Sequence, residues 1–177
     1  MTAVEVLKYT LILLDEKALA EALTESSVLD EKTSKLLDCL NMTQNDIATH
    51  YFPIRIREEV AGKNIAYSSL SREIISVLSG YDKFFRALKF KEYESAVEFA
   101  GNAKYIEYSA VPHKMTLSST LEIKCPIQIV AYGVLSEYFL LVNDYEDAEI
   151  FEERFKESLL SFSHKHGELR LRNRRWI

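Results

Sequence analysis

The stretch from Pro126 to Phe162, PIQIVAYGVLSEYFLLVNDYEDAEIFEERFKESLLSF, decides the fold, because it predicts two antiparallel helices joined by a tight turn. In the first helix, from Pro126 to Val142, apolar residues occur on every side, so we expect it to be buried all round. Proline suits the first position of a helix, where an N–H would have no partner. Asn143 can adopt the left-handed conformation that ends a helix.

The second helix of this hairpin has an amphipathic pattern. Asp144 can cap it, and Asp147 places negative charge in its first turn, where the helix dipole is positive. Glutamates and a lysine lie largely between its apolar positions. Those apolar positions recur at three- and four-residue steps, at Ala148, Phe151, Phe155, Leu159 and Phe162.

Length and composition indicate one globular domain. The chain has 177 residues, 47% apolar and 28% charged, which suits one sizeable core and is short for two. No apolar run reaches the roughly 18–20 residues that a membrane span needs, and the apolar run at Leu11–Leu14 follows Glu5 without a basic leader, so we expect neither a signal peptide nor a membrane partner. Cys39 and Cys125 predict two buried thiols in a reducing compartment, with a disulfide as the alternative.

Charge is unevenly distributed along the chain. The net charge is −5, but residues 1–164 contain 17 Lys/Arg and 26 Asp/Glu, a net charge of −9. From Lys165 onward there are five basic residues and one acid. An acidic body is a poor general binder of nucleic acid, because phosphates repel it.

The N-terminal part predicts helices. Thr2 and Glu5 have the spacing of a capping box, so a helix should begin there and end near Leu14. Residues 15–23 either continue this helix or form a short second one, and the serines at 26–27 mark a break.

A longer helix should follow. Asp30 can cap it, and its apolar positions suggest that it reaches about Tyr51, with a possible kink at the polar stretch Asn41–Asn45. Pro53 disfavours helix at the residue before it.

The region of about 54–111 predicts four to six short strands in a mainly antiparallel sheet. Gly62–Asn64 and Ala100–Asn102 suggest hairpin turns. Helices, strands and helices then follow in order, which predicts an α+β fold: a helical bundle with a central small antiparallel β region. We expect residues 1–164 to form a single domain with the β-rich insertion at about 54–111, and residues 165–177 to form a basic C-terminal arm.

Catalytic and metal-binding motifs are lacking, so the prediction is a protein that is not an enzyme and uses no cofactor and no metal. The histidines at 50, 113, 164 and 166 have no zinc-ligand spacing. Glu58 and Glu59 are adjacent and therefore point to opposite faces of a strand, which rules out a carboxylate pair. An enzyme would need a tight pocket around Glu137, His50 or His113.

Two residues inside the apolar helix have structural interpretations. Glu137 is its one charge, so it should meet an arginine or several donors, or face a partner subunit. Gly133 weakens a helix and should allow another backbone to come close.

Exposed aromatic residues and the basic arm point to binding of other proteins. Five aromatic residues lie in strand, turn or tail contexts where we expect exposure, namely Tyr81, Phe84, Phe85, Tyr93 and Trp176. The arm interleaves apolar and basic residues and should dock on an acidic surface, such as that of a neighbouring copy. Its predicted partner-binding residues are Arg170, Leu171, Arg172, Arg174, Arg175, Trp176 and Ile177.

The order of these pieces resembles the bacteriophage head–tail connector or neck adaptor family, which includes tail-tubular and portal-accessory ring proteins. The resemblance covers most of the chain and is better in its C-terminal half. It is carried by the segments Leu36–Asn41, Tyr51–Ile54, Glu58–Glu59, Ile65–Leu70, Tyr108–Pro112, Tyr132–Tyr138, Phe151–Phe155 and Arg174–Trp176.

The resemblance implies a virion structural protein at the head–tail junction, present in the host cytoplasm during assembly. Such proteins form a homo-oligomeric ring, commonly of twelve copies, that links the portal protein to tail proteins while DNA only passes through the lumen. The acidic body fits a lumen that does not hold DNA. The alternative is a small cytoplasmic protein-binding adaptor or regulator of non-viral type, and nucleic-acid binding through the arm is a further rival.

Overall fold

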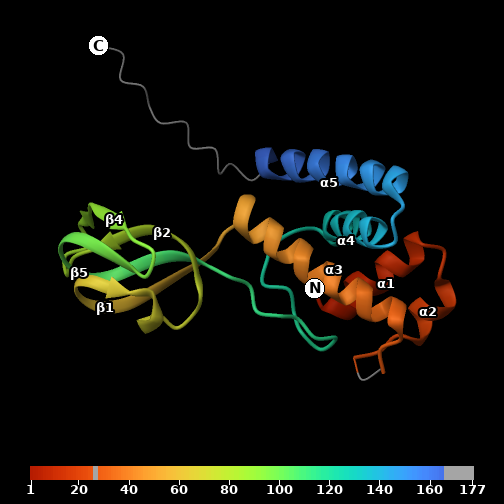
Figure 1. Ribbon diagram of the computed structural model, residues 1–177, viewed down its shortest axis with the longest axis horizontal. Coiled ribbons are helices and arrows are strands. Elements are labelled where there is room, and N and C mark those ends of the chain that lie inside the picture. The colour runs from red at the N-terminus through yellow and green to blue at the C-terminus, as the bar shows by residue number, and fades with distance from the viewer. Residues whose placement is uncertain (26–27, 166–177) are drawn as a thin grey trace, which may run out of the picture. The chain divides into compact units, whose positions relative to one another are not determined.

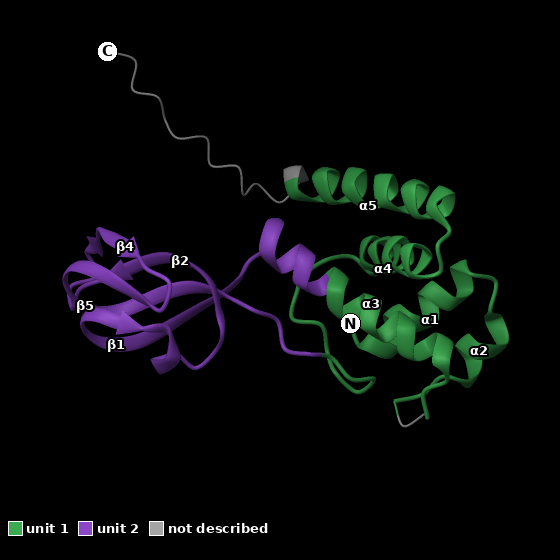
Figure 2. Ribbon diagram, viewed as in Figure 1, with its two compact units in different colours: residues 1–43, 115–177 green, residues 44–114 purple. Residues whose placement is uncertain are grey.

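The computed structural model describes residues 1–25 and 28–165, and the fold is α+β, as predicted (Figure 1). The chain divides into two compact units (Figure 2). Residues 1–43 and those from 115 onward form one, which we call the helical unit; residues 44–114 form the other, the sheet unit. The predicted break at residues 26–27 lies outside the described residues.

The helical unit begins with the predicted capping box. Helix α1 spans Ala3–Leu13, and the Glu5 carboxylate accepts from the N–H of Thr2 at 2.7 Å. Asp15 has φ 59°, a left-handed conformation that ends this helix, and α2 follows as a separate short helix at Lys17–Ala22. Of the two alternatives for residues 15–23, the short second helix is therefore the correct one, and the first helix does not continue.

Helix α3 spans Glu31–His50 and passes from the helical unit into the sheet unit. The Asp30 carboxylate accepts from the N–H of Thr33 at 2.9 Å, which is the predicted cap. The polar stretch near residue 41 continues as helix. Asn41 donates to the carbonyl of Leu37 at 2.9 Å and accepts from the N–H of Met115 at 2.6 Å, so it ties a distant segment to α3.

Helices α4 (Ile127–Leu141) and α5 (Tyr145–Lys165) form the predicted hairpin. Asn143 has φ 62°, and Asp144 accepts from the N–H of Asp147 at 3.4 Å. The prediction that α4 is buried all round is wrong at its C-terminal end. Ile129 through Ser136 are buried apart from the half-buried Tyr132, whereas Leu140, Leu141 and Val142 are 46%, 52% and 41% exposed.

Gly133 is the point where three helices meet. A Cβ at this residue would lie 2.5 Å from Cγ2 of Thr43 on α3 and 2.9 Å from Cε2 of Phe155 on α5. A close approach was predicted here, but the neighbours are side chains rather than a backbone.

All pairing in the sheet unit is antiparallel. The strand order is β1-β5-β2-β3, and β4 also pairs with β5. A single 3-10 turn, Tyr67–Ser69, follows β1. The strands are β1 Ile54–Ala66, β2 Ile74–Tyr81, β3 Ala87–Leu88, β4 Phe90–Glu92 and β5 Ala96–Ala110.

Both hairpins predicted inside this unit are wrong. Residues 62–64 belong to the long strand β1, and residues 100–102 belong to the long strand β5. Gly62 has φ 132° and lies at a shift of register in the β1–β5 pairing, so it forms a bulge instead of a turn. Glycine suits both a hairpin turn and a β-bulge, and only the pairing with the distant strand β5 shows which of the two forms here.

The sheet unit has its own core and one glycine that this core requires. A Cβ at Gly80 on β2 would lie 2.0 Å from the ring of Phe99, which is fully buried. The other buried members are Ile65, Val77, Val97, Ala103, Ile106, Tyr108 and Ala110.

Candidate functional site

The predicted partner-binding residues of the arm lie outside the described residues, so no surroundings are assigned to them. This holds for Arg170, Leu171, Arg172, Arg174, Arg175, Trp176 and Ile177. Two surface features among the described residues are candidates instead. One is a groove in the helical unit, and the other is an aromatic turn in the sheet unit.

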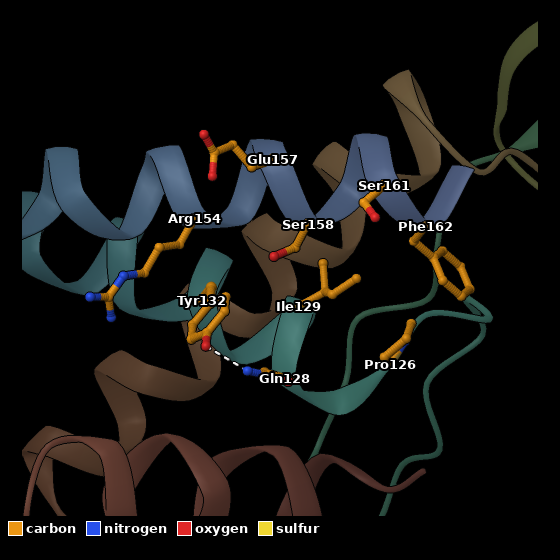
Figure 3. Close-up of a pocket in the computed structure, with 9 residues that line it drawn as sticks. All are labelled: Pro126, Gln128, Ile129, Tyr132, Arg154, Glu157, Ser158, Ser161 and Phe162. Atoms are coloured by element: carbon orange, nitrogen blue, oxygen red, sulfur yellow. Dashed lines mark hydrogen bonds between the residues drawn. The ribbon is translucent and has the colours of Figure 1, made fainter. Parts of the chain in front are cut away.

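The groove runs between α4 and α5 and has a volume of about 650 Å³ (Figure 3). Figure 3 shows Ser158 and Ser161 pointing from α5 toward α4, with Ile129 between the two helices and Phe162 and Pro126 toward one end. Its lining residues are Pro126, Gln128, Ile129, Tyr132, Arg154, Glu157, Ser158, Ser161 and Phe162. The lining is mixed, with apolar side chains beside hydroxyl groups.

Polar groups at the other end of the groove are held in place by neighbours. Gln128 donates from Nε2 to the hydroxyl of Tyr132 at 2.6 Å (Figure 3). The guanidinium of Arg154 lies 5.4 Å from the ring centroid of Phe151, while Glu157 extends from the opposite edge of α5 in this view. The lining therefore includes an amide donor, hydroxyl groups and the cation of Arg154, whereas the carboxylate of Glu157 points away from α4.

Helix α5 carries a concentration of negative charge beside this groove. From Glu146 to Glu157 it contains six acidic residues and two basic ones. Glu152 pairs with Lys156 one turn away. Within the described part of the chain, no ion pair engages the exposed carboxylates of Glu146, Glu149, Glu153 and Glu157.

The aromatic turn, Asp82–Arg86, connects β2 and β3 and is tightly built. The Asp82 carboxylate accepts from the N–H groups of Phe84 at 2.8 Å and Arg86 at 2.9 Å. Phe85 has φ 60° and stacks on Tyr105 with ring centroids 4.9 Å apart. A left-handed conformation is unusual for a bulky side chain, so this turn holds its shape at some cost.

Phe84 projects from this turn into solvent between two cations. It is 65% exposed, with Nζ of Lys83 4.9 Å and Cζ of Arg86 5.6 Å from its ring centroid. Exposure was predicted here and is confirmed, as it is for Phe85 and Tyr93, which are 59% and 54% exposed. Tyr81 is half-buried, because it lies in β2, so its predicted exposure is wrong. Trp176 lies outside the described residues.

Glu58 and Glu59 lie on opposite faces of β1, as predicted. Glu59 points outward and pairs with Lys104 on β5. Glu58 points inward, where its carboxylate accepts from the Ser71 N–H at 3.1 Å and from the Ser71 and Tyr108 hydroxyls. Burial acts to raise the pKa of Glu58, but these donors outweigh it and leave the pKa below its usual value. This cluster holds the segment after β1 against the sheet.

Both cysteines are buried free thiols, as predicted. Burial raises the pKa of Cys125 to about 12, and burial together with the charge of Glu137 raises the pKa of Cys39 to about 12. Glu137 itself is half-buried, and its negative charge disfavours the thiolate form of Cys39 on α3. Thiols with such pKa values are poor nucleophiles and poor metal ligands at neutral pH.

His50 and His113, the two histidines whose side chains the structure describes, line neither candidate feature. His50 is exposed and lies 3.6 Å from the carboxylate of Asp46, and the carbonyl of His113 accepts from Gln44 at 3.4 Å. Across residues 1–25 and 28–165, no cluster of three or more His, Cys, Asp or Glu side chains is arranged to hold a metal ion. In the same part of the chain, no helix is both long and apolar enough to span a membrane.

No family model matches the chain, and no curated protein matches it.

The aromatic turn could be predicted from the sequence better than the groove could. The turn lies in the run KFFR at residues 83–86, and its exposed phenylalanines between basic residues were a usable signal. The groove gave no such signal. Gln128 and Arg154 are 26 positions apart in sequence, and periodicity places each on a helix without showing which helix lies beside it.

Proposed function

We propose that the protein is a structural component of a phage neck, forming a homo-oligomeric ring that links the portal to the tail. The observation that carries the proposal is the apolar surface exposed at the end of α4 and on the aromatic turn. Leu140 and Leu141 at the end of α4 and Phe84 on the aromatic turn are each between 46% and 65% exposed. Exposed apolar groups of this kind are typical of surfaces that other protein chains cover.

The distribution of charge supports the same function. The described part of the helical unit has 8 Lys/Arg and 17 Asp/Glu, a net charge of −9, and the sheet unit has 10 and 9, a net charge of +1. A ring whose helical units carry such negative charge would let DNA slide past without phosphate contacts. The resemblance to neck proteins over most of the chain agrees with this arrangement.

The test is assembly with a portal. The full chain is co-expressed with the portal protein of the phage that encodes it, purified, and examined by negative-stain electron microscopy. We expect rings of this protein seated on portal particles. A chain that stays monomeric and separate from the portal would overturn the proposal.

The same exposed surface suits the alternative, an adaptor that binds one host protein. Affinity purification of the tagged full chain from infected and uninfected cells separates the two functions. Virion components in the infected sample support the neck function, whereas one host protein recovered equally from both samples supports the adaptor.

A further inference from the structure

The segment Lys83–Lys91, which begins in the aromatic turn directly after Asp82 and ends in β4 directly before Glu92, has a distinct surface. It contains four basic residues, three phenylalanines and no acidic residue. Within the part of the chain that the structure describes, none of these four exposed cations takes part in an ion pair. The segment therefore presents four exposed cations without an ion pair among the described residues, two of them beside the exposed ring of Phe84.

Three other cations of the sheet unit are paired across strands. Arg57 pairs with Glu107 at 2.9 Å, Lys63 pairs with Glu98 at 3.5 Å, and Lys104 pairs with Glu59. These pairs cross from β1 to β5 or back and neutralise that face. Against this background the unpaired charge of Lys83–Lys91 marks one part of the unit as a contact surface.

The aromatic turn is also organised before any partner arrives. Two N–H groups on one carboxylate and the stacking of Phe85 on Tyr105 hold it in one shape, with Phe84 outward. The left-handed backbone of Phe85 is strained, because a bulky side chain crowds the carbonyl in that conformation. Strain kept at an exposed site is a reason to suspect function, and a rigid aromatic anchor loses little entropy on binding.

The groove and α5 of the helical unit have the complementary properties. The part of α5 from Glu146 to Glu157 has a net charge of −4, and the Lys83–Lys91 segment has +4. The groove supplies apolar contacts from Ile129, Tyr132 and Phe162. Aromatic anchors that fill such pockets, rimmed by opposite charges, commonly dominate the binding energy of protein interfaces.

We propose that Phe84 of one copy enters the groove between α4 and α5 of a second copy. Lys83 and Arg86 then approach Glu157, which is among the lining residues, and Glu153, which lies one helical turn before it on α5. The cation of Arg154, which already lies over one aromatic ring, can receive the face of Phe84 as a second. This inference rests on the proposed function and names the surfaces by which copies of the ring meet.

The contact joins two different surfaces of the same chain. Such a heterologous contact continues from copy to copy and closes into a ring when the rotation permits. Each copy would offer one aromatic turn and one groove, so every internal contact of a closed ring would be the same.

Cysteine cross-linking of the full chain tests the contact directly. Ala87→Cys, an exposed position beside the turn that leaves Phe84 and its flanking cations in place, is mixed with Ser161→Cys under oxidising conditions, and Ser118→Cys, also exposed on the helical unit, replaces Ser161→Cys in the control. The buried native thiols, Cys39 and Cys125, should not interfere. We expect a cross-linked dimer from the first mixture at least about tenfold above the control. Equal yields, or no dimer in either mixture, would overturn the proposal.

Charge reversal provides the second test, read as self-association by sedimentation at low salt. Lys83→Glu/Arg86→Glu and Glu153→Arg/Glu157→Arg should each weaken association about tenfold or more, since about 1.4 kcal/mol corresponds to tenfold. The four changes combined in one chain should restore it. Glu146→Arg/Glu149→Arg, which changes the charge of α5 equally but lies farther along the helix from the lining residue Glu157, is the matched control and should have the smaller effect.

The outcomes separate this contact from its alternatives. Association that persists in the Lys83→Glu/Arg86→Glu variant overturns the proposal. A salt-sensitive shift of single-stranded DNA that these two changes abolish, without any cross-link, assigns the segment to nucleic acid and also overturns it. If the variants with altered turn or groove still form rings on the portal, the inference fails and the neck function stands. If the wild-type chain forms no ring there, the neck function fails.

Discussion

The α4–α5 hairpin of the helical unit and the β1–β5 pair of the sheet unit differ in how far apart in sequence their contacting residues lie. In the helical unit, α4 and α5 are neighbours in sequence, and their turn is specified by three consecutive residues at 142–144. In the sheet unit, β1 pairs with β5, and partners such as Ile56 and Tyr108 are about 50 residues apart. Local signals therefore specify the α4–α5 hairpin, while the β1–β5 pairing depends on residues that no short stretch contains.

The two units also use charge differently. On the outer face of the sheet, opposite charges alternate across strands and cancel, as in the pairs of Arg57 with Glu107 and Lys104 with Glu59. On α5, carboxylates follow one another with few compensating cations. Exposed pairs contribute little to stability, so this difference concerns what each surface can bind more than how firmly it folds.

The largest expected effect is in the sheet unit, at Gly80→Ala. The added Cβ would lie 2.0 Å from the ring of Phe99, which is fully buried, so the ring or the strand must shift. We expect a loss of about 3 kcal/mol in the free energy of unfolding, measured by urea denaturation. Hydrogen exchange should show the loss of protection in residues 44–114.

The matched control is Gly101→Ala in the same sheet. Its Cβ would meet only Leu88, at an ordinary distance of 3.6 Å, so its effect should be small. If Gly80→Ala and Gly101→Ala are equally stable, the close packing of β2 against Phe99 is wrong.

In the helical unit the corresponding change is Gly133→Ala, with a smaller expected effect. The clash with Thr43 and Phe155 should cost about 1–3 kcal/mol, but alanine favours helix by about 1 kcal/mol over glycine. We expect a net loss of about 1–2 kcal/mol in urea denaturation. Adding Thr43→Ser removes the methyl group that the new Cβ meets, so the double variant should recover part of the loss. A double variant no better than Gly133→Ala would contradict this packing.

The third prediction concerns pH and tests whether the inner face of β1 differs from the outer face. The pKa of Glu58 is lowered in the folded state, so its stabilising contribution is present above the unfolded pKa of about 4.3 and is lost as pH falls through the lower folded value. Glu58→Gln should cost about 1 kcal/mol at neutral pH and flatten the acid dependence of unfolding.

Glu59→Gln is the control for this prediction, because Glu59 is the next residue, exposed, and paired only with Lys104 on the surface. Its effect should remain within a few tenths of a kcal/mol. Similar acid profiles for the two variants would show that the contacts of Glu58 with Ser71 and Tyr108 do not set its pKa.

The smallest effect is expected from two buried hydroxyls, one in each unit. Thr43 and Ser109 are each 2% exposed, and their hydroxyl oxygens have no hydrogen-bond partner among the described residues. Thr43→Val and Ser109→Ala should each leave stability unchanged or raise it by up to about 1 kcal/mol in thermal unfolding. A loss above that size in either unit would show that its hydroxyl is satisfied.

The two candidate features were predictable to different degrees. The aromatic turn could be anticipated, since KFFR between turn residues predicts exposed phenylalanines, and Phe84 and Phe85 are exposed. Its left-handed residue and its support by Tyr105 could not, because Tyr105 lies 20 positions away in another strand. The groove was not predicted, since apolar periodicity identifies a buried face but not the helix that covers it.

The sequence by itself determined the local structure: the capping box at Thr2, the cap at Asp30, the end of α4 at Asn143 and the opposite faces of Glu58 and Glu59. Each of these depends on contacts within a few residues, which neighbouring side chains are sufficient to specify. Only the tertiary structure decided that Gly62 is a bulge, that Gly80 makes room for Phe99, and that α4 and α5 enclose a groove. Those outcomes depend on which distant segments pack together, and packing is settled by the whole core at once rather than by any one stretch.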